Sequence, residues 1–135
     1  MNPAITDLDH VQLPIPVGGS RAARHFYERV LGLNERRHPA LDQPGCLRYA
    51  LGRRRLDLRE GAYTGIAPQA HLALVVGNLA EILARFKAHA VTYEVSALED
   101  RAFVEDPFRN RIELISAEPG PDNGLWRLRE LNIAV

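Results

Sequence analysis

Four side chains that can bind a metal ion or transfer a proton interrupt otherwise apolar segments. His10 lies in LDHVQLPIP and His71 in AHLALVV, whereas Asp57 and Glu113 each stand between two aliphatic residues. Two imidazoles and one carboxylate form a facial triad, which leaves coordination positions open and suits Zn, Ni, Fe, Mn or Co. A carboxylate buried in a strand is costly unless it is paired or bound to a metal. We therefore predict that His10, His71 and Glu113 hold one divalent metal.

Each of these residues also has a simpler interpretation. A single half-buried histidine is more often held by a hydrogen bond than by a metal. Arg111, two residues before Glu113, could neutralise that carboxylate, or it could bind an anionic group of a substrate. Asp57 is flanked by Arg55 and Arg59, so it is a candidate fourth ligand, a candidate catalytic base, or only the partner of an arginine.

The sequence divides into two related halves, and each half contains one candidate histidine and one candidate acid. The histidines are 61 residues apart and the acids are 56 residues apart. In each half a strand precedes a helix and then paired strands, which predicts an internal duplication. We place the first module at about residues 5–61 and the second at about 68–116, followed by a tail, 117–135, within a single domain of residues 1–135. Neither half alone would bury much surface, so we expect a shared core.

One amphipathic helix is predicted in each module. The first begins at Ser20 as N-cap, has apolar residues at four-residue spacing, and ends at Gly32, which tolerates a left-handed conformation. The second begins after the N-cap Asn78, with Glu81 in the position of a capping box. Each helix has one apolar face and must cover one face of a sheet.

Alternation along the strands places the candidate ligands on the face away from the helices. His10 and Gln12 share one face of their strand, and the aliphatic residues between them point the other way. His71 and Glu113 alternate with aliphatic residues in the same manner. If the helices cover the aliphatic faces, the polar faces form a concave interior between the modules. Gln12 is then a candidate substrate-binding residue beside His10.

Length and composition narrow the possible functions. A chain of 135 residues is the size of one domain, and its 17 basic and 17 acidic residues cancel, which disfavours nucleic acid as a partner. Cys46 is the single cysteine, so any metal must use nitrogen and oxygen ligands. No apolar stretch is long enough to span a membrane, and the first residues do not resemble a signal peptide. We expect a cytoplasmic protein.

Four segments together resemble a known family. LDHVQLPIP, FYERVLGL, HLALVVGNL and FVEDPFRNRIELI are similar to segments of the vicinal oxygen chelate superfamily, which includes glyoxalase I, fosfomycin-resistance thiol transferases, extradiol dioxygenases and bleomycin-resistance proteins. The resemblance covers residues 7–116. It implies an α+β fold in which tandem βαβββ modules form a cup-shaped mixed sheet with helices on the outer face. It also implies that His10, Asp57, His71 and Glu113 surround a divalent metal that chelates neighbouring substrate oxygens.

The sequence departs from the family pattern at two positions. Asp57 stands where glyoxalase I has glutamate, which bears on the fourth ligand and on a second catalytic carboxylate. Arg109 stands in the turn DPFRNR where the superfamily often has glycine, so this turn needs a conformation that a side chain can tolerate.

Two functions from different classes follow from these features. The first is a glyoxalase-like metal enzyme with lyase, isomerase or thiol-transfer chemistry, in which Glu113 or Asp57 moves a proton at a carbon next to a carbonyl. The alternative is a metal-free protein that binds a drug or another small molecule in a cup lined by Tyr49, Phe103 and Trp126. Tyr49 and Phe103 are also candidate substrate-binding residues of the enzyme. The resemblance and the apolar tail further imply a homodimer.

Overall fold

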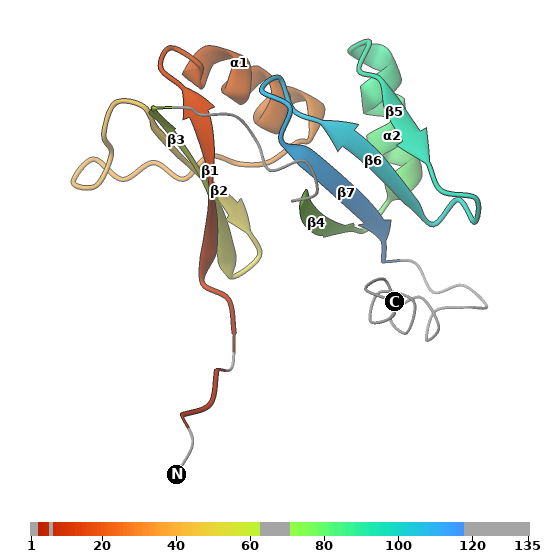
Figure 1. The fold of residues 1–135 in the computed structure, drawn as a ribbon, viewed down its shortest axis with the longest axis horizontal. Coiled ribbons are helices and arrows are strands. Elements are labelled where there is room, and N and C mark those ends of the chain that lie inside the picture. The colour runs from red at the N-terminus through yellow and green to blue at the C-terminus, as the bar shows by residue number, and fades with distance from the viewer. Residues whose placement is uncertain (1–2, 6, 63–70, 118–135) are drawn as a thin grey trace.

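The structure is a computed structural model that describes residues 3–5, 7–62 and 71–117 (Figure 1). In these ranges the elements follow in the order β1 (His10–Pro16), α1 (Ser20–Arg24), η1 (His25–Val30), β2 (Cys46–Leu51), β3 (Arg54–Gly61), β4 (His71–Val76), α2 (Leu79–Ala88), β5 (Tyr93–Val95), β6 (Arg101–Glu105) and β7 (Arg111–Ser116). The π-helix η1 directly continues α1. No helix in the described ranges is long and apolar enough to cross a membrane.

The strands form two sheets of the same topology. The strand order is β1-β3-β2 in the first sheet and β4-β7-β6-β5 in the second. In each sheet the opening strand pairs in parallel with the closing strand, which pairs in antiparallel with the strand before it. An isolated bridge between Glu35 and Tyr49 takes the place in the first sheet that β5 has in the second. The predicted α+β fold of two related modules is confirmed.

Several of the predicted turn and cap residues have the expected conformation. The Asn78 side chain caps α2 by accepting a hydrogen bond from the Glu81 N–H at 3.1 Å. Gly32 follows η1 with a left-handed φ of 79°. Arg109 is also left-handed, with φ of 72°. The DPFRNR turn therefore keeps a conformation that favours glycine although it carries a side chain.

The prediction that Ser20 caps the first helix was wrong. Gly19 is the N-cap, and Ser20 is the first helical residue. The Ser20 hydroxyl donates instead to the carboxylate of Glu60 on β3, which also accepts a hydrogen bond from the Gly18 N–H at 2.7 Å. These hydrogen bonds lower the pKa of Glu60. A carboxylate from a distant strand thus binds the positive end of this helix, a contact that local sequence does not reveal.

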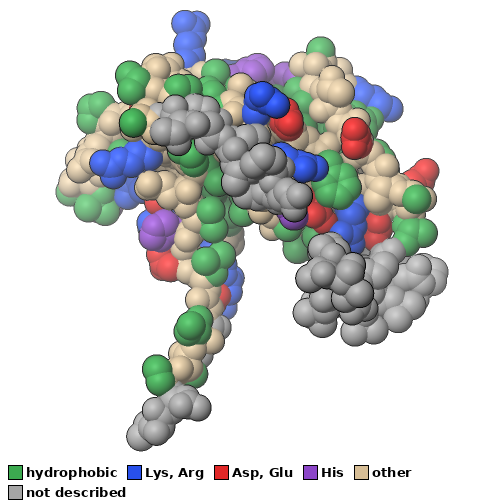
Figure 2. Space-filling view, in the orientation of Figure 1, with side chains coloured by type: hydrophobic (Ala, Val, Ile, Leu, Met, Phe, Trp, Pro, Cys, Tyr) green, Lys and Arg blue, Asp and Glu red, His purple; other side chains and the backbone are tan. Residues whose placement is uncertain are grey.

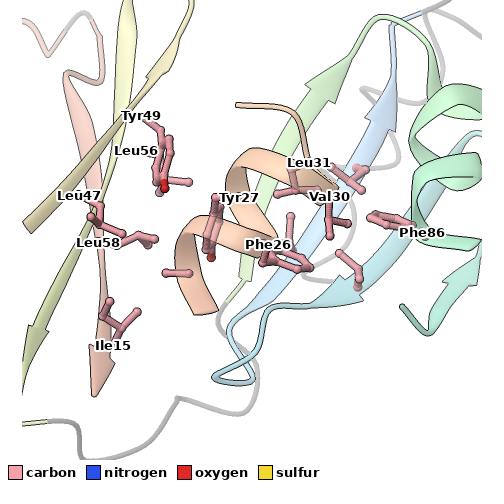
Figure 3. Close-up of a cluster of buried hydrophobic side chains, with 14 of the residues drawn as sticks. Ile15, Phe26, Tyr27, Val30, Leu31, Leu47, Tyr49, Leu56, Leu58 and Phe86 are labelled. Carbon is pink, nitrogen blue, oxygen red and sulfur yellow. The ribbon is translucent and has the colours of Figure 1, made fainter. Parts of the chain in front are cut away.

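A continuous hydrophobic core joins the two modules. Figure 3 shows η1 between the two sheets, with Tyr27 on the side of the first sheet and Leu31 on the side of the second. Tyr27 stacks on Tyr49 of β2 at a ring-centroid distance of 5.8 Å, and Phe86 of α2 is fully buried. The apolar face of each sheet is therefore turned toward the helices, and its other face is turned away from them.

The turn between β6 and β7 links the two modules through the buried Asp106. One carboxylate oxygen accepts hydrogen bonds from the N–H groups of Phe108 and Asn110. The other accepts from the Tyr27 hydroxyl at 2.7 Å and from the Asn110 side chain at 2.8 Å. The Asn110 side chain also donates to the Pro14 carbonyl at 3.3 Å. Burial raises the pKa of Tyr27 well above its ordinary value, so its hydroxyl stays protonated as a donor.

Candidate metal centre

The predicted ligands His71 and Glu113 are in contact in the second sheet. The Nε2 atom of His71 lies 3.1 Å from Oε1 of Glu113. Strand register explains the contact, because His71 lies opposite Arg111 in the parallel pair and Glu113 follows two residues later on the same face. The histidine side chain is 41% exposed and the glutamate side chain only 3%. A partly exposed imidazole therefore covers a buried carboxylate.

The charge of Glu113 is neutralised from the neighbouring strand β6. Nη1 of Arg101 lies 2.7 Å from Oε2, the second oxygen of Glu113. Arg101 is opposite Ile115, which places it diagonally across from Glu113 on the same face. The sequence interpretation named Arg111 as the competing cation and missed Arg101. Alternation predicts the face of Arg101, but its contact with Glu113 depends on the register between two strands.

The first sheet repeats this arrangement with His10 and Asp57. His10 lies opposite Arg55 in a parallel pair, so Asp57 has the same offset from His10 that Glu113 has from His71. One oxygen of Asp57 accepts a hydrogen bond from Nε of Arg55 at 2.7 Å, and the other lies 4.0 Å from Nε2 of His10. This second distance is longer than in the second sheet, as expected for a side chain with one methylene group fewer. The predicted arginine pair of Asp57 is present, and it leaves one oxygen facing the histidine.

Asp9 belongs to the same cluster, although the sequence interpretation did not include it. Its carboxylate lies 2.7 Å from Nδ1 of His10, and this hydrogen bond lowers the pKa of Asp9. A carboxylate at Nδ1 favours the tautomer that carries its proton there, which leaves the lone pair on Nε2. Nε2 is the atom that faces Asp57. The adjacency of Asp9 and His10 was the available signal.

Three predicted substrate-binding residues lie on the polar faces. Gln12 is exposed in register with Asp57, and Phe103 is half-buried in register with Glu113. Arg111 is exposed on the same face as Glu113. Phe103 and Arg111 also line a hollow of about 740 Å³ beside β5. This hollow reaches the polar face of the second sheet through Phe103 and Arg111, and neither His71 nor Glu113 is among its lining residues.

Tyr49 lies in the core, which corrects the prediction that it lines the cup. It is 0% exposed and stacks on Tyr27. The residue of β2 in register with Asp57 is Arg48, so alternation turns the adjacent Tyr49 to the opposite face. The prediction relied on residue type instead of strand position. Trp126, the third predicted lining residue, lies outside the described residues, as does the tail from residue 118 onward.

The two histidine–acid pairs do not meet within one chain. They lie on the outward faces of two sheets that have η1 between them (Figure 3). Among residues 3–5, 7–62 and 71–117, no three histidine, cysteine or acidic side chains form a group that could hold a metal. Each pair is thus one half of the predicted donor set.

The side chains of each pair nevertheless fit a divalent metal. Two ligand atoms bound to one metal at about 2.0–2.2 Å lie about 2.8–3.1 Å apart at the 90° angle of octahedral geometry and about 3.3–3.6 Å apart at a tetrahedral angle. The 3.1 Å between His71 and Glu113 fits the octahedral case. Imidazole nitrogen and carboxylate oxygen suit zinc and the neighbouring transition metals. Arg101 and Arg55 each hold the other carboxylate oxygen, an arrangement that orients a metal ligand from outside.

Comparisons with known proteins agree with the fold. A sequence model described as Glyoxalase/Bleomycin resistance protein/Dioxygenase superfamily matches residues 7–114. The solved structure of a Bacillus anthracis protein assigned to the glyoxalase family is 30% identical, with a TM-score of 0.76, and the match covers 87% of this chain and 100% of that one. No curated protein matches the chain.

Two more distant solved structures share the fold. Lactoylglutathione lyase from Agrobacterium tumefaciens is 21% identical, with a TM-score of 0.63, and the match covers 85% of this chain and 96% of that one. The fosfomycin resistance protein FosX from Mesorhizobium loti is 13% identical, with a TM-score of 0.69 and coverage of 95% and 99%. At these identities the likeness concerns the fold alone.

Proposed function

Because the chain belongs to the Glyoxalase/Bleomycin resistance protein/Dioxygenase superfamily, we propose that it is a divalent-metal enzyme of the glyoxalase-like kind. Its substrate is a small molecule with neighbouring oxygen atoms, and its reaction is of the lyase, isomerase or thiol-transfer type. His10, His71 and Glu113 hold the metal, and Asp57 is the fourth ligand or the catalytic base. One observation carries the proposal: both sheets present a histidine and an acid at the same register offset.

The centre is completed between two chains. Each chain supplies one pair from its first sheet and one from its second, and the two faces are turned away from the helices. In a dimer with two-fold symmetry, the first sheet of one subunit faces the second sheet of its partner, which generates two equivalent sites. His10 and Asp57 of one subunit then meet the partner's His71 and the partner's Glu113. Such a homodimer is part of the proposal.

The charges of the two faces support this pairing. On the first sheet, arginines outnumber acids on the face of Asp57; on the second, glutamates outnumber arginines on the face of Glu113. Opposite charges across an interface fix its register and exclude like faces. The side chains concerned are Arg48, Arg55 and Arg59 with Asp57, and Glu94, Glu105 and Glu113 with Arg101 and Arg111.

The residues of the centre have distinct tasks in the proposed reaction. When bound, a divalent metal supplies Lewis acidity to neighbouring oxygens, which makes a proton on the adjacent carbon easier to remove. Arg101 keeps Glu113 in place as a charged ligand. Asp57 has one oxygen that makes no short contact with the residues that the structure describes, since it lies 4.0 Å from Nε2 of His10. This oxygen accepts the proton from the substrate carbon, as a general base does.

Metal analysis of the desalted protein tests the proposal. We expect close to one equivalent of Ni, Zn, Fe, Mn or Co per chain in protein purified without chelator or affinity nickel. His71→Ala should lose at least about nine-tenths of it, because removal of a first ligand exceeds the 10- to 100-fold loss typical of outer-shell changes. His38→Ala is the matched control, since His38 is an exposed loop residue. A full equivalent in His71→Ala that remains after exhaustive dialysis, which removes metal held weakly at the surface, would contradict the metal centre.

The metal-free binding protein receives less support from the structure. Of the aromatic residues predicted to line its binding cup, Tyr49 is buried in the core instead. Among the described residues of this set, Phe103 alone lies on the polar face of a sheet. A single aromatic ring is a small stacking surface for a planar drug. The histidine–acid pairs would also have no role in that function. The metal enzyme is therefore the function that the geometry supports best.

A further inference from the structure

Two histidines of different modules touch on the helical side of the molecule, away from the proposed centre. His25 begins η1 in the first module, and His89 is the C-cap of α2 in the second. Their ring centroids are 5.4 Å apart, with an angle of 77° between the ring planes. Both residues are exposed. Histidine side chains are visible at the upper edge of the molecule in Figure 2, over the helices.

The spacing of these rings is that of two imidazoles on one metal ion. A metal–nitrogen distance of about 2.0–2.1 Å places each ring centre about 3.2 Å from the metal. At a tetrahedral angle, the two ring centres are then about 5.2 Å apart. The observed 5.4 Å is close to this value. The distance between the ring centres therefore fits two imidazoles that share one ion.

We propose that His25 and His89 form a second, surface site for a divalent transition metal such as Ni²⁺, Cu²⁺ or Zn²⁺. Within the described part of the chain, no third histidine, cysteine or acid joins them in a metal-binding group, so water completes the coordination. Imidazole suits these three metals, and their affinity for such ligands exceeds that of Mn²⁺ or Fe²⁺. The inference concerns a site separate from the proposed function and does not depend on it.

The surface beside His89 leaves space for such an ion. His89 lines an open hollow of about 860 Å³ together with side chains of η1 and the segment after it. Arg85 of α2 lines the same hollow, where it donates to the Arg29 carbonyl at 3.4 Å and lies 3.8 Å from Glu81. Because the two histidines come from different modules, a bound metal would connect η1 to α2. The ion would stabilise the folded chain through that link.

Titration of tag-free protein with Ni²⁺ alone tests this site. The proposed centre is first disabled by His10→Ala and His71→Ala together, so that remaining binding belongs elsewhere. This background should bind about one Ni²⁺ per chain and unfold at a higher temperature when Ni²⁺ is present. Adding His25→Gln or His89→Gln should weaken the binding at least tenfold and abolish the thermal shift. Adding His38→Gln, an exposed histidine outside the pair, should change neither.

The two residues must act together for the proposal to hold. If His25→Gln binds Ni²⁺ as tightly as the background, or if only one of the two substitutions weakens the binding, the ion is held by a single exposed imidazole. Either result would overturn the proposal. If the background variant does not fold, side-chain NMR of the unsubstituted chain serves instead. Small amounts of Cu²⁺ should then broaden the imidazole signals of His25 and His89 equally. Broadening of neither signal would leave the pair as a ring contact only.

Discussion

Tyr27 and Tyr49 stack on each other in the core, yet their hydroxyl groups are in opposite situations. Both residues are 0% exposed. The Tyr27 hydroxyl donates to Asp106 at 2.7 Å, whereas the Tyr49 hydroxyl is buried without a hydrogen-bond partner among the described residues. A buried polar atom without a partner costs about 1–3 kcal/mol. Burial also raises the pKa of both tyrosines.

Removing the two hydroxyls should therefore change stability in opposite directions. Tyr49→Phe deletes an unpaired polar atom, so we expect the free energy of unfolding to rise by about 0.5–1.5 kcal/mol. Tyr27→Phe deletes a hydrogen bond to a buried carboxylate, so we expect it to fall by about 1.5–3 kcal/mol. Urea unfolding at neutral pH measures both. A loss of stability in Tyr49→Phe would mean that its hydroxyl has a partner in the folded protein.

At the scale of residues, the sequence predicts the candidate metal ligands better than it predicts the side chains that contact them. Alternation places His10, His71 and Glu113 on polar faces, as the structure has them. It does not identify Arg101 as the partner of Glu113, because that contact depends on the register of β6 on β7. Tyr49 was misplaced although alternation with Arg48 was available.

At the scale of elements, the turn between β6 and β7 contains a strained residue. Arg109 has φ of 72°, and its N–H donates to the Asp106 carbonyl at 3.0 Å. A residue with a side chain pays about 1–2 kcal/mol in this conformation, while glycine loses more backbone entropy on folding. Arg109→Gly should therefore stabilise the protein by about 0.5 kcal/mol. Thermal unfolding should show a higher midpoint for Arg109→Gly than for Arg109→Ala, which removes the same side chain without relieving φ. Equal midpoints would count against the strain.

The sequence predicts the start of a helix correctly where the contact that fixes it lies within a few residues. Asn78 caps α2 through a contact three residues away, and this cap was predicted. Ser20 was predicted as a cap and is not one, because Glu60 reaches the helix end from 40 residues further along the chain. The first sheet has three strands where the second has four. In place of a fourth strand it has the isolated bridge between Glu35 and Tyr49. Contacts between distant segments decide such features, and local sequence does not contain them.

At the scale of the whole molecule, Asp106 joins the modules. Its carboxylate accepts hydrogen bonds from four donors, one of them the Tyr27 hydroxyl of the first module. Asp106→Asn replaces one accepting oxygen by an N–H₂ group, which cannot accept hydrogen bonds from the donors that face it. We therefore expect the free energy of unfolding to fall by about 2–4 kcal/mol. Glu99→Gln, an exposed residue of the turn between β5 and β6, should change it by less than about 0.5 kcal/mol. Urea unfolding of both variants measures the difference, and a similar small effect for both would contradict the role of Asp106.

The orientation of the two sheets makes a prediction about assembly that neither sheet makes alone. If each centre combines His10 of one chain with His71 of the other, then His10→Ala and His71→Ala homodimers both lack every complete site. After unfolding and joint refolding of equal amounts, half of the dimers are mixed, and each mixed dimer has one intact site and one that lacks both histidines. About a quarter of the wild-type metal content should return. A centre built within one chain would recover nothing, because each chain would keep its own defect. Metal analysis of the mixture, with each variant refolded separately as the control, therefore distinguishes the two arrangements.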